Sequence, residues 1–501
     1  MNDDIIDDAN SREFYEELVA PVKGILPEEY HGVGLTERMP RVVEDWTRTV
    51  LTVSNENEVP AMASFFVSLG QVIKDFIRIP RGKNTEDTRL HFCWVQTSGT
   101  GKSTLWNFMG PVTKQLNKMI NKFEGTDASD ASEVYIKNKY DMFDVVEYTD
   151  AALIGYYEKL DEKDDNGDPI YERRSGSLEG NGLAHWDEFE YSGVFKQSQH
   201  KENIIVYLNT LMNTLEGESW VITKKLKEGH LMECMCQRSV WATTYPPKHL
   251  KSVIAEKGVL QRMLVYVREV PEDEQHDMRM LQLSKSGKKE ETKLDTEKFS
   301  KALFRLYKDV KARYLEVGGD PFSTMEYSDG FADALINEYQ KMRDYVKSSR
   351  PEIREIAQNF MTRNNIQLLK LSVMCCVANS PNVKDKTKKF LVTPTHVRQA
   401  YILTQQCYST LVEWLERSLK VQKETLAEKS KQVEFIDIYE TLPKDKNGFI
   451  RKNTLLEGVQ QIAKVSPASV YRYWKNLEDR FEKDKVGRSV LVRLKKGDEK
   501  Q

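Results

Sequence analysis

A short glycine-rich stretch, "QTSGTGKST" (residues 96–104), carries the clearest chemistry in this sequence. Consecutive backbone N–H groups in such a loop, together with the positive end of a following helix, bind phosphate oxygens. Lys102 is then placed to reach the β- and γ-phosphates of a nucleotide, and the Ser103 hydroxyl to hold Mg²⁺. The stretch therefore predicts a site for ATP and Mg²⁺. Its predicted nucleotide-binding residues are Gly99, Thr100, Gly101, Lys102, Ser103 and Thr104.

One position departs from the usual pattern of such loops, because Gln96 stands where the first glycine is expected. This position lies at the end of a predicted strand, where the backbone must turn but no phosphate has to be approached closely. We therefore expect the loop to bind phosphate in spite of the missing glycine. The alternative is a chance glycine turn in front of a helix.

An acid pair follows at the end of another predicted strand. The stretch "GLAHWDEFE" (residues 182–190) places Asp187 and Glu188 after an apolar run that His185 interrupts. Asp187 is predicted to bind Mg²⁺, and Glu188 to polarise the water that attacks the γ-phosphate. Glu190 is interpreted as a solvated companion. The alternative is a surface Asp-Glu pair without a catalytic role.

Two further polar residues stand beside predicted strands, at positions suited to phosphate chemistry. Thr243, followed by Thr244, ends the strand in "SVWATTYPP" and can orient water between the γ-phosphate and Glu188. Arg262 precedes the apolar run in "GVLQRMLVYV", where an arginine can stabilise charge that develops on a neighbouring subunit's γ-phosphate. The alternatives are an ordinary strand threonine and a surface salt bridge.

The elements around the loop have the order that a phosphate loop requires. Helical periodicity over residues 63–77 precedes a strand at residues 90–96, and an amphipathic helix is predicted over residues 102–123. Residues 144–160 predict a second strand–helix unit. The "DDNGD" stretch after it predicts a hairpin turn rather than a calcium loop, because Arg173 stands where the twelfth ligand should be acidic.

The chain changes character in its second half. Residues 219–247 predict a strand, a turn at residues 227–230 and a second strand, ending in a third strand that belongs to the core. Residues 272–294 predict a charged linker, and residues 295–423 predict long helices.

The order of motifs in this chain resembles that of phage- and plasmid-encoded helicase-like replication ATPases, which are AAA+ relatives of the superfamily 3 helicases. The motifs are the phosphate loop, "HWDEFE", "WATTYPP" and "GVLQRMLVYV", in this order. The resemblance covers about residues 60–420, and "MTRNNIQLLKLSVMCCVA" (residues 361–378) is similar to the family's arginine-bearing helix. The resemblance makes Arg363 a candidate second arginine at the nucleotide. It also implies the family's nucleotide-binding and catalytic roles for Lys102, Ser103, Asp187, Glu188, Thr243 and Arg262. Gln96, His185 and Trp186 depart from the family pattern.

The turn at residues 227–230 has a further implication under this resemblance. In superfamily 3 helicases a hairpin in this place enters the ring channel and grips DNA. Lysines on such a hairpin can engage a phosphate backbone without reading bases, although a solvent-facing turn carries lysines as well. The candidate DNA contacts here are Lys224, Lys225, Lys227 and His230.

The C-terminal segment predicts a separate DNA-binding module. Three predicted helices and then two strands about a Val-Gly turn follow the order of a winged helix, and Ser466 with Pro467 marks the start of the third helix. From residue 464 to residue 496, ten Lys and Arg stand against four Asp and Glu. This local excess predicts DNA contact, with protein docking as the alternative. The candidate phosphate contacts are Arg472, Lys475, Arg488 and Lys495.

Composition limits the class of protein. The 501 residues are 40% hydrophobic with a net charge of −3, which is typical of a soluble protein of about two to four domains. The apolar runs are too short to span a bilayer, the N-terminus lacks the order of a secretory signal, and the six cysteines are interpreted as reduced thiols. We therefore expect a cytoplasmic protein without membrane contact, in the host cell's cytoplasm if it is viral.

These observations combine into one expected architecture, an α/β P-loop NTPase core of AAA+ type with additional helical and winged-helix parts. The predicted divisions are an N-terminal helical segment (1–60), the ATPase domain (61–275), a helical domain (276–425) and a winged-helix module (426–501). The expected function is that of a ring-forming, hexameric ATP hydrolase that translocates on single-stranded or forked DNA in the replication of a virus or mobile element. The alternatives are a non-translocating, ATP-switched initiator or loader, and a defence or signalling ATPase whose winged helix docks a protein.

Substitution of the acid pair tests this interpretation. We expect Glu188→Gln to bind ATP nearly normally and to hydrolyse it at least about 100-fold more slowly, because positioning or activating the water contributes roughly that much. Lys102→Ala should abolish hydrolysis and also weaken nucleotide binding. Steady-state ATPase assays and nucleotide titrations measure both effects, and a Glu188→Gln protein with the parental rate would refute the assignment.

Overall fold

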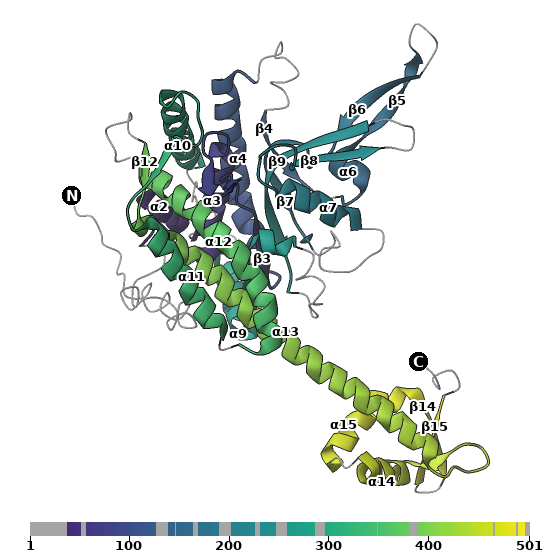
Figure 1. Cartoon of the computed structure of the whole chain (residues 1–501). Coiled ribbons are helices and arrows are strands. Elements are labelled where there is room, and N and C mark those ends of the chain that lie inside the picture. The colour runs from purple at the N-terminus through teal and green to yellow at the C-terminus, as the bar shows by residue number, and fades with distance from the viewer. Residues whose placement is uncertain are drawn as a thin grey trace. The chain divides into compact units, whose positions relative to one another are not determined.

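The computed structural model describes residues 38–51, 57–126, 139–145, 147–163, 169–189, 202–225, 231–246, 258–285, 296–347, 349–380, 389–463, 466–486 and 489–495. The described residues fall into two compact units, which divide between Glu416 and Arg417 (Figure 1).

The first unit is built around a six-stranded sheet in which β10, β3, β9, β7 and β4 follow one another in that order. These strands pair in parallel, and β8 pairs antiparallel with the first part of β9. The carboxyl ends of the parallel strands therefore share one edge of the sheet, and the amino ends share the other. The strands are β3 (Phe92–Gln96), β4 (Tyr140–Asp144), β7 (Gly180–Trp186), β8 (Val221–Lys225), β9 (Leu231–Thr244) and β10 (Leu264–Arg268).

Strand β3 lies between β10 and β9, and every one of its residues is buried. Its nearly continuous apolar sequence is typical of a parallel strand that is covered on both faces. Phe92 stacks on Trp241 of the neighbouring β9 with ring centroids 4.8 Å apart. The predicted α/β architecture with a parallel sheet is therefore confirmed.

Helices flank this sheet, and Figure 1 shows strands β4, β7 and β9 between helix α4 and helix α7. Helix α4 (Lys102–Glu124) follows the phosphate loop directly and ends at Gly125, whose left-handed backbone (φ +74°) closes the helix. The other helices of the first unit are α2 (Arg41–Leu51), α3 (Glu58–Ile73), α6 (Asp150–Ile154), α7 (Glu202–Leu211), α9 (Glu272–Lys285), α10 (Thr296–Glu316), α11 (Phe331–Lys347) and α12 (Pro351–Asn379).

Trp46 joins several of these helices. Its ring makes edge-on contacts with Phe65 of α3, Phe108 of α4 and Phe299 of α10, at centroid distances of 5.8, 5.4 and 5.3 Å. Its indole N–H donates to the Ser64 hydroxyl (3.0 Å). Helix α2 therefore packs into the same core as the helix that follows the phosphate loop.

The second predicted strand–helix unit is wrong in part. β4 ends at Asp144, α6 ends at Ile154, and residues 155–163 form strand β5 (Gly155–Lys163) instead of a continued helix. Gly155 has φ +98°, which ends the helix, and β5 pairs antiparallel with β6 (Pro169–Ser175). The antiparallel pairing of β5 and β6 agrees with the predicted hairpin, whose turn residues 164–168 lie outside the described residues.

The predicted charged linker over residues 272–294 is also wrong in part, because residues 272–285 form helix α9. Three acidic residues occupy its first turn, directly after Pro271, where they favour a helix amino terminus. The charges that resembled a linker are thus those of an exposed helix. Among the helices that the structure describes, no segment is long and apolar enough to cross a membrane.

Two small sheets complete the first unit. β1 (Ile79–Arg81) pairs antiparallel with β2 (Asn84–Glu86), and β11 (Met325–Tyr327) pairs in parallel with β12 (Phe390–Val392). Helix α13 (Pro394–Thr441) follows β12 and continues into the second unit.

The second unit contains the end of α13, two further helices and a three-stranded antiparallel sheet of order β13-β15-β14. Its elements are β13 (Ile450–Arg451), α14 (Lys452–Ala463), α15 (Pro467–Leu477), β14 (Phe481–Val486) and β15 (Ser489–Leu494). The predicted order of three helices and a hairpin is confirmed. The Ser466 side chain caps α15 by accepting from the N–H of Ser469 (3.3 Å), as predicted.

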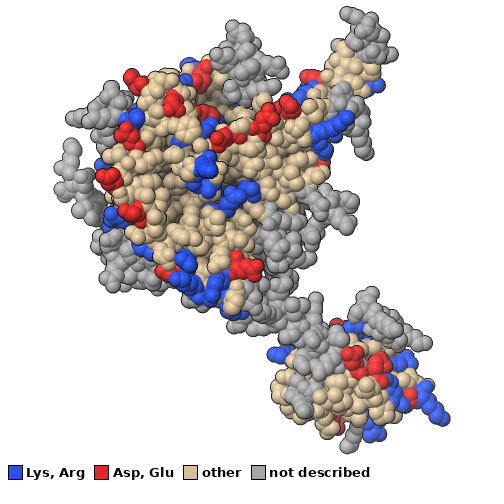
Figure 2. All heavy atoms as spheres, in the orientation of Figure 1, with Lys and Arg blue, Asp and Glu red and all other residues tan. Residues whose placement is uncertain are grey.

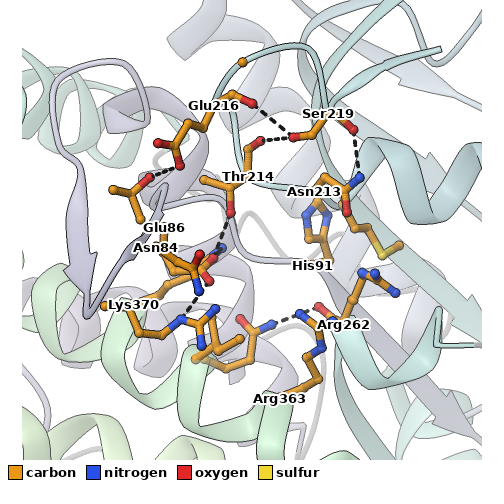
Figure 3. A pocket seen from close by; sticks show the side chains of 16 residues that line it. Asn84, Glu86, His91, Asn213, Thr214, Glu216, Ser219, Arg262, Arg363 and Lys370 are labelled. Atoms are coloured by element: carbon orange, nitrogen blue, oxygen red, sulfur yellow. Dashed lines mark hydrogen bonds and ion pairs between the residues drawn. The ribbon is translucent and has the colours of Figure 1, made fainter. Parts of the chain in front are cut away.

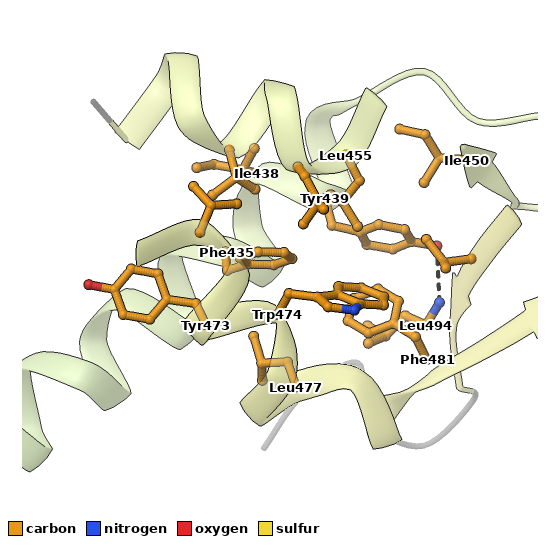
Figure 4. Close-up of a cluster of buried hydrophobic side chains, with 14 residues drawn as sticks. Phe435, Ile438, Tyr439, Ile450, Leu455, Tyr473, Trp474, Leu477, Phe481 and Leu494 are labelled. Carbon is orange, nitrogen blue, oxygen red and sulfur yellow. Dashed lines mark hydrogen bonds between the residues drawn. The ribbon is translucent and has the colours of Figure 1, made fainter. Parts of the chain in front are cut away.

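A single hydrophobic cluster holds this unit together (Figure 4). Val470, Trp474 and Leu477 point inward from α15, which confirms the predicted apolar stripe. Trp474 contacts Phe481 at the start of β14, with centroids 5.2 Å apart. The Tyr439 hydroxyl of α13 accepts from the backbone N–H of Leu494 (3.2 Å), so helix and sheet are joined by a polar bond as well.

Candidate nucleotide-binding site

The phosphate loop follows β3 at the carboxyl edge of the sheet. Gly99 and Gly101 have φ angles of +75° and +92°, a conformation that glycine adopts without strain. Helix α4 begins immediately afterwards at Lys102. The turn therefore directs the first N–H groups of α4 and the positive end of its dipole toward the loop, as an anion site requires.

The side chain of Gln96 organises this loop from inside the protein. Its Oε1 accepts from the indole N–H of Trp94 (2.7 Å), and its Nε2 donates to Asn57 Oδ1 (2.9 Å) and to the Thr100 hydroxyl (2.8 Å). Asn57 donates in turn to the backbone carbonyl of Thr100 (2.9 Å), and the Thr100 hydroxyl donates to the carbonyl of Thr97 (2.6 Å). Gln96 is fully buried, so these bonds are shielded from water.

The departure from glycine at this position thus has a structural reason. A glycine at position 96 would remove the acceptor for the buried Trp94 indole N–H and the donor to the side-chain amide oxygen of Asn57. Gln96 is thus more than a tolerated deviation, and neither its role nor the participation of Asn57 is evident from the sequence, because the two residues are 39 positions apart in the chain.

Lys102 lies across the loop that it follows. Its ammonium donates to the backbone carbonyls of Gln96 (2.6 Å) and Thr97 (3.1 Å) and lies 4.6 Å from the ring centre of Tyr245. The cation is therefore held at the loop, where a bound triphosphate would meet it. Tyr245 directly follows β9, and nothing in the sequence marks it as part of this site.

The acid pair stands at the same edge of the sheet. Asp187 Oδ1 accepts from the Thr243 hydroxyl (2.5 Å) at the end of β9, so the structure brings these two predicted residues together. Glu188 has φ +51°, and among the described residues it is the one non-glycine with positive φ. Such a backbone costs on the order of 1 kcal/mol, and functional sites are where this strain is commonly found.

The two unusual residues before the acid pair are packing residues. The ring of His185 stacks on Trp106 of α4 at 3.7 Å, and its Nδ1 lies 2.9 Å from Asp144 Oδ1 at the end of β4. Burial lowers the pKa of His185, although Asp144 opposes this effect. Trp186 is buried against Phe189. These contacts fix the acid strand against the helix that carries Lys102.

The donor set fits Mg²⁺. Ser103 is exposed at the start of α4, and Asp187 is exposed at the end of β7, so a hydroxyl and a carboxylate are accessible at one edge of the sheet. Mg²⁺ prefers oxygen ligands and retains several water molecules, so it needs few ligands from the protein. Among the residues that the structure describes, no group of three or more His, Cys, Asp or Glu side chains is placed to hold a metal ion.

The two predicted arginines lie at the opposite edge of the sheet. Arg262 ends the turn before β10, and Leu264 of β10 pairs with Phe92 at the start of β3. The far ends of the same two strands pair Arg268 with Gln96, next to the phosphate loop. Arg262 is therefore at the amino edge, whereas the loop is at the carboxyl edge.

A cavity of about 540 Å³ opens at this amino edge (Figure 3). Figure 3 shows Arg262 and Arg363 close together on the side away from Glu216. Lys370 also lines the cavity, and its ammonium is 3.6 Å from Glu86. The other lining groups have no signal in the sequence, because they come from β1, from β2, from the residue before β3 and from the segment after α7. They include Arg81, Asn84, His91, Asn213, Thr214 and Ser219.

The electrostatics of the two arginines favour an anion. Arg262 Nη1 donates to Asn209 Oδ1 (2.7 Å) and to the carbonyl of Gly258 (3.2 Å). Burial, and then the positive charge of Arg363, lowers the pKa of Arg262. Within the described part of the chain, neither Arg262 nor Arg363 has a carboxylate within ion-pair distance. Two neighbouring guanidinium groups thus line one cavity without a carboxylate within ion-pair distance among the described residues, whereas Glu86 and Glu216 line other parts of it.

The predicted DNA contacts of the hairpin are only partly described. Lys224 forms an ion pair with Asp150 of α6, so it has a structural partner in addition to its predicted role. Lys225 is exposed at the end of β8. Lys227 and His230 lie outside the described residues. The assignment of these residues to DNA stays a prediction.

The second unit presents an exposed basic face on α15. Arg472 and Lys475 are exposed one turn apart, and Tyr471 beside them is 58% exposed, an aromatic that sequence analysis did not single out. Lys495 is exposed at the end of β15, and Arg488 lies outside the described residues. In Figure 2, Lys and Arg side chains gather along one edge of this unit.

Comparison of the sequence with models of protein families and with curated proteins finds no significant match in either.

The bonds of Gln96 yield a testable consequence. We expect Gln96→Leu, which keeps the approximate side-chain size, to weaken ATP binding by about 10-fold or more, because each buried group left without a partner costs about 1–3 kcal/mol. Isothermal titration measures ATP binding, and thermal unfolding measures the stability of the protein. Asn107→Ala on the exposed face of α4 is the control, and it should bind ATP like the parent. Parental binding by Gln96→Leu would show that the loop holds its shape without this network.

Proposed function

We propose that this protein is an ATP hydrolase of the helicase type, which assembles into a ring and uses hydrolysis to move along DNA. The observation that carries the proposal is the division of the charged residues between the two edges of one parallel sheet. The phosphate loop with its acid pair occupies the carboxyl edge, and the arginine pair occupies the amino edge. Each subunit would thus contribute its phosphate loop and acid pair to one nucleotide site and its arginines to another.

The carboxyl edge supports hydrolysis. Lys102 neutralises phosphate charge, and Asp187 is oriented by Thr243, which leaves its second oxygen available. Bound Mg²⁺ would be held by Ser103 and Asp187 and would draw negative charge from the phosphate oxygens. Glu188 is the adjacent carboxylate and accepts the hydrogen bond that orients the attacking water.

The amino edge supports a site that is shared between subunits. The five paired residues of β3 and β10 rise about 3.3 Å each, so the strands alone separate Arg262 from its own loop by roughly 16 Å. An arginine side chain does not span this distance. Arg262 and Arg363 therefore act on a nucleotide of another copy, and repetition of this heterologous contact closes a ring. A hexamer is the expected assembly.

DNA as the substrate of the motor is supported by charge. The exposed Lys225 ends β8, and Lys227 and His230 follow it in the sequence, a set of basic residues that suits a phosphate backbone. The second unit has the element order of a winged helix, with a basic, capped α15. Replication of a virus or mobile element is the proposed setting, and it derives from the family resemblance.

Mixing two inactive variants tests the shared site. Arg262→Ala and Glu188→Gln proteins should each hydrolyse ATP slowly, and their mixture should regain activity at interfaces that combine an intact Glu188 with an intact Arg262. ATPase rates over a series of mixing ratios measure the recovery. Subunit exchange is verified by energy transfer between labelled subunits. With exchange verified, a mixture no faster than the sum of its parts would contradict the shared site.

A second test addresses DNA. Replacement of Lys225 and Lys227 with alanine should reduce DNA-stimulated hydrolysis and the unwinding of a forked duplex. It should also lower the slope of log affinity against log salt by about 0.7 for each lost contact on a single strand. Arg417→Ala, outside both proposed DNA surfaces, is a control for the loss of a surface cation. Stimulation without unwinding in the parent would favour an initiator or loader, and no DNA affinity at low salt would favour a protein-docking ATPase.

A further inference from the structure

Helix α7 (Glu202–Leu211) lies between the β8–β9 hairpin and the arginine at the amino edge. It packs against β8 and β9, and Ile204, Leu208 and Leu211 are buried on its inner side. The helix follows the acid pair in the chain and precedes β8. Its polar side chains make two separate sets of contacts, one with the strand of the predicted DNA hairpin and one with Arg262.

The first set joins α7 to β8. Asn203 Nδ2 donates to Asp150 Oδ2 (3.3 Å), and the same carboxylate forms the ion pair with Lys224. The Tyr207 hydroxyl, on a side chain that is 6% exposed, interacts with Lys224 as well. Asn203 and Tyr207 are four positions apart, so they share one face of the helix.

The second set joins α7 to the arginine. Asn209 Oδ1 accepts from Arg262 Nη1 at 2.7 Å. Asn209 is two positions beyond Tyr207, which places it about 200° around the helix, on nearly the opposite face. If α7 shifts where it contacts Lys224, Asn209 Oδ1, which accepts the hydrogen bond from Arg262, therefore moves as well.

The surroundings of Arg262 leave its side chain little freedom. A Cβ atom at Gly258 would lie 2.9 Å from Arg262 Nη1, so the guanidinium is seated directly against this glycine. Gln367 of α12 donates to the Arg262 carbonyl (2.8 Å). The carboxyl end of α7 is anchored in turn, because Arg89 donates to the carbonyl of Leu211 (3.0 Å). A displacement of α7 that moves Asn209 would therefore act on the Arg262 guanidinium, which is seated against Gly258.

The amide of Asn209 is suited to this task. It orients the guanidinium through a hydrogen bond but carries no charge, so Arg262 keeps its full positive charge for a phosphate. A carboxylate in the same place would form an ion pair with Arg262 and compete with the phosphate. The neutral amide therefore orients the guanidinium of Arg262 and leaves it available to bind a phosphate.

We propose that Asn209 is the positioning residue of Arg262, and that α7 couples DNA contact at the β8–β9 hairpin of one subunit to hydrolysis of the ATP bound by its neighbour. This inference rests on the proposed function, because it requires that Arg262 acts on a nucleotide and that the hairpin contacts DNA. It names the residue and the helix through which DNA stimulates hydrolysis.

The first experiment compares substitutions on α7 in the full-length protein. We expect Asn209→Ala to lower kcat about 10-fold or more with unchanged ATP affinity, since misplacement of a catalytic group by about 1 Å can cost up to 100-fold. Asn209→Asp should also lower kcat, although its unfolding temperature should equal that of the parent. Val206→Ala, on an exposed part of the same helix, is the matched control and should retain the parental kcat. Parental kcat in both Asn209 variants would overturn the positioning role.

The second experiment tests the coupling through a double-mutant cycle on DNA-stimulated hydrolysis. Lys224→Met and Asn209→Ala change side chains on opposite sides of α7, so independent effects would multiply. We expect the double variant to be at least about 3-fold more active than that product, because the path through α7 is already broken by either change. A double variant that matches the product would overturn the coupling but not the positioning role.

The parallel measurement of Arg262→Ala separates this inference from the proposed function. If Arg262→Ala hydrolyses ATP at the parental rate, the shared site itself is refuted, and the inference is refuted with it. If Arg262→Ala is slow and both Asn209 variants are as fast as the parent, the shared site stands and only the role of α7 is refuted. Slow Asn209 variants, together with a double variant more active than the product of the two single effects, support both the shared site and the role of α7.

Discussion

The parallel pairing of β10, β3 and β9 is the constraint on which the rest of the structure depends. Parallel strands put every carboxyl end at one edge, so the loop after β3, the acid pair after β7 and Thr243 at the end of β9 meet without further adjustment. The same pairing puts Arg262, which precedes β10, at the other edge. The charged side chains are therefore divided between two edges of one sheet, and under the proposed function a second copy would bring them together.

A buried polar network supports the first of these edges. Gln96, Asn57 and Thr100 exchange hydrogen bonds behind the phosphate loop, out of contact with water. A satisfied buried network of this kind fixes one conformation, because every alternative leaves polar groups unpaired. The shape of the loop is thereby set from the protein core and does not depend on glycine at the first position.

A second buried network supports the other edge. Burial alone would raise the pKa of Asp87, but the charges of Arg89 and Lys370 outweigh this effect and lower it. Arg89 also binds the carbonyl at the end of α7, and Lys370 brings α12 to the same place. The cavity with Arg262 and Arg363 is thus bordered by Lys370, which is already paired with Glu86, whereas the two guanidinium groups have no carboxylate within ion-pair distance among the described residues.

The sequence by itself determined the local features: the glycine loop before an amphipathic helix, the acid pair after an apolar strand, and the cap and apolar stripe of α15. These follow from the spacing of neighbouring residues, and the structure contains each of them. It did not determine the ending of α6 at Gly155 or the helix α9, where strand pairing and the charges of the first turn decided between similar patterns. Only the tertiary structure decided that Gln96 meets Asn57, that Asn209 meets Arg262, and that Arg262 lies opposite its own phosphate loop. Those contacts depend on strand order and register, which bring together residues far apart in the chain and which no local periodicity encodes.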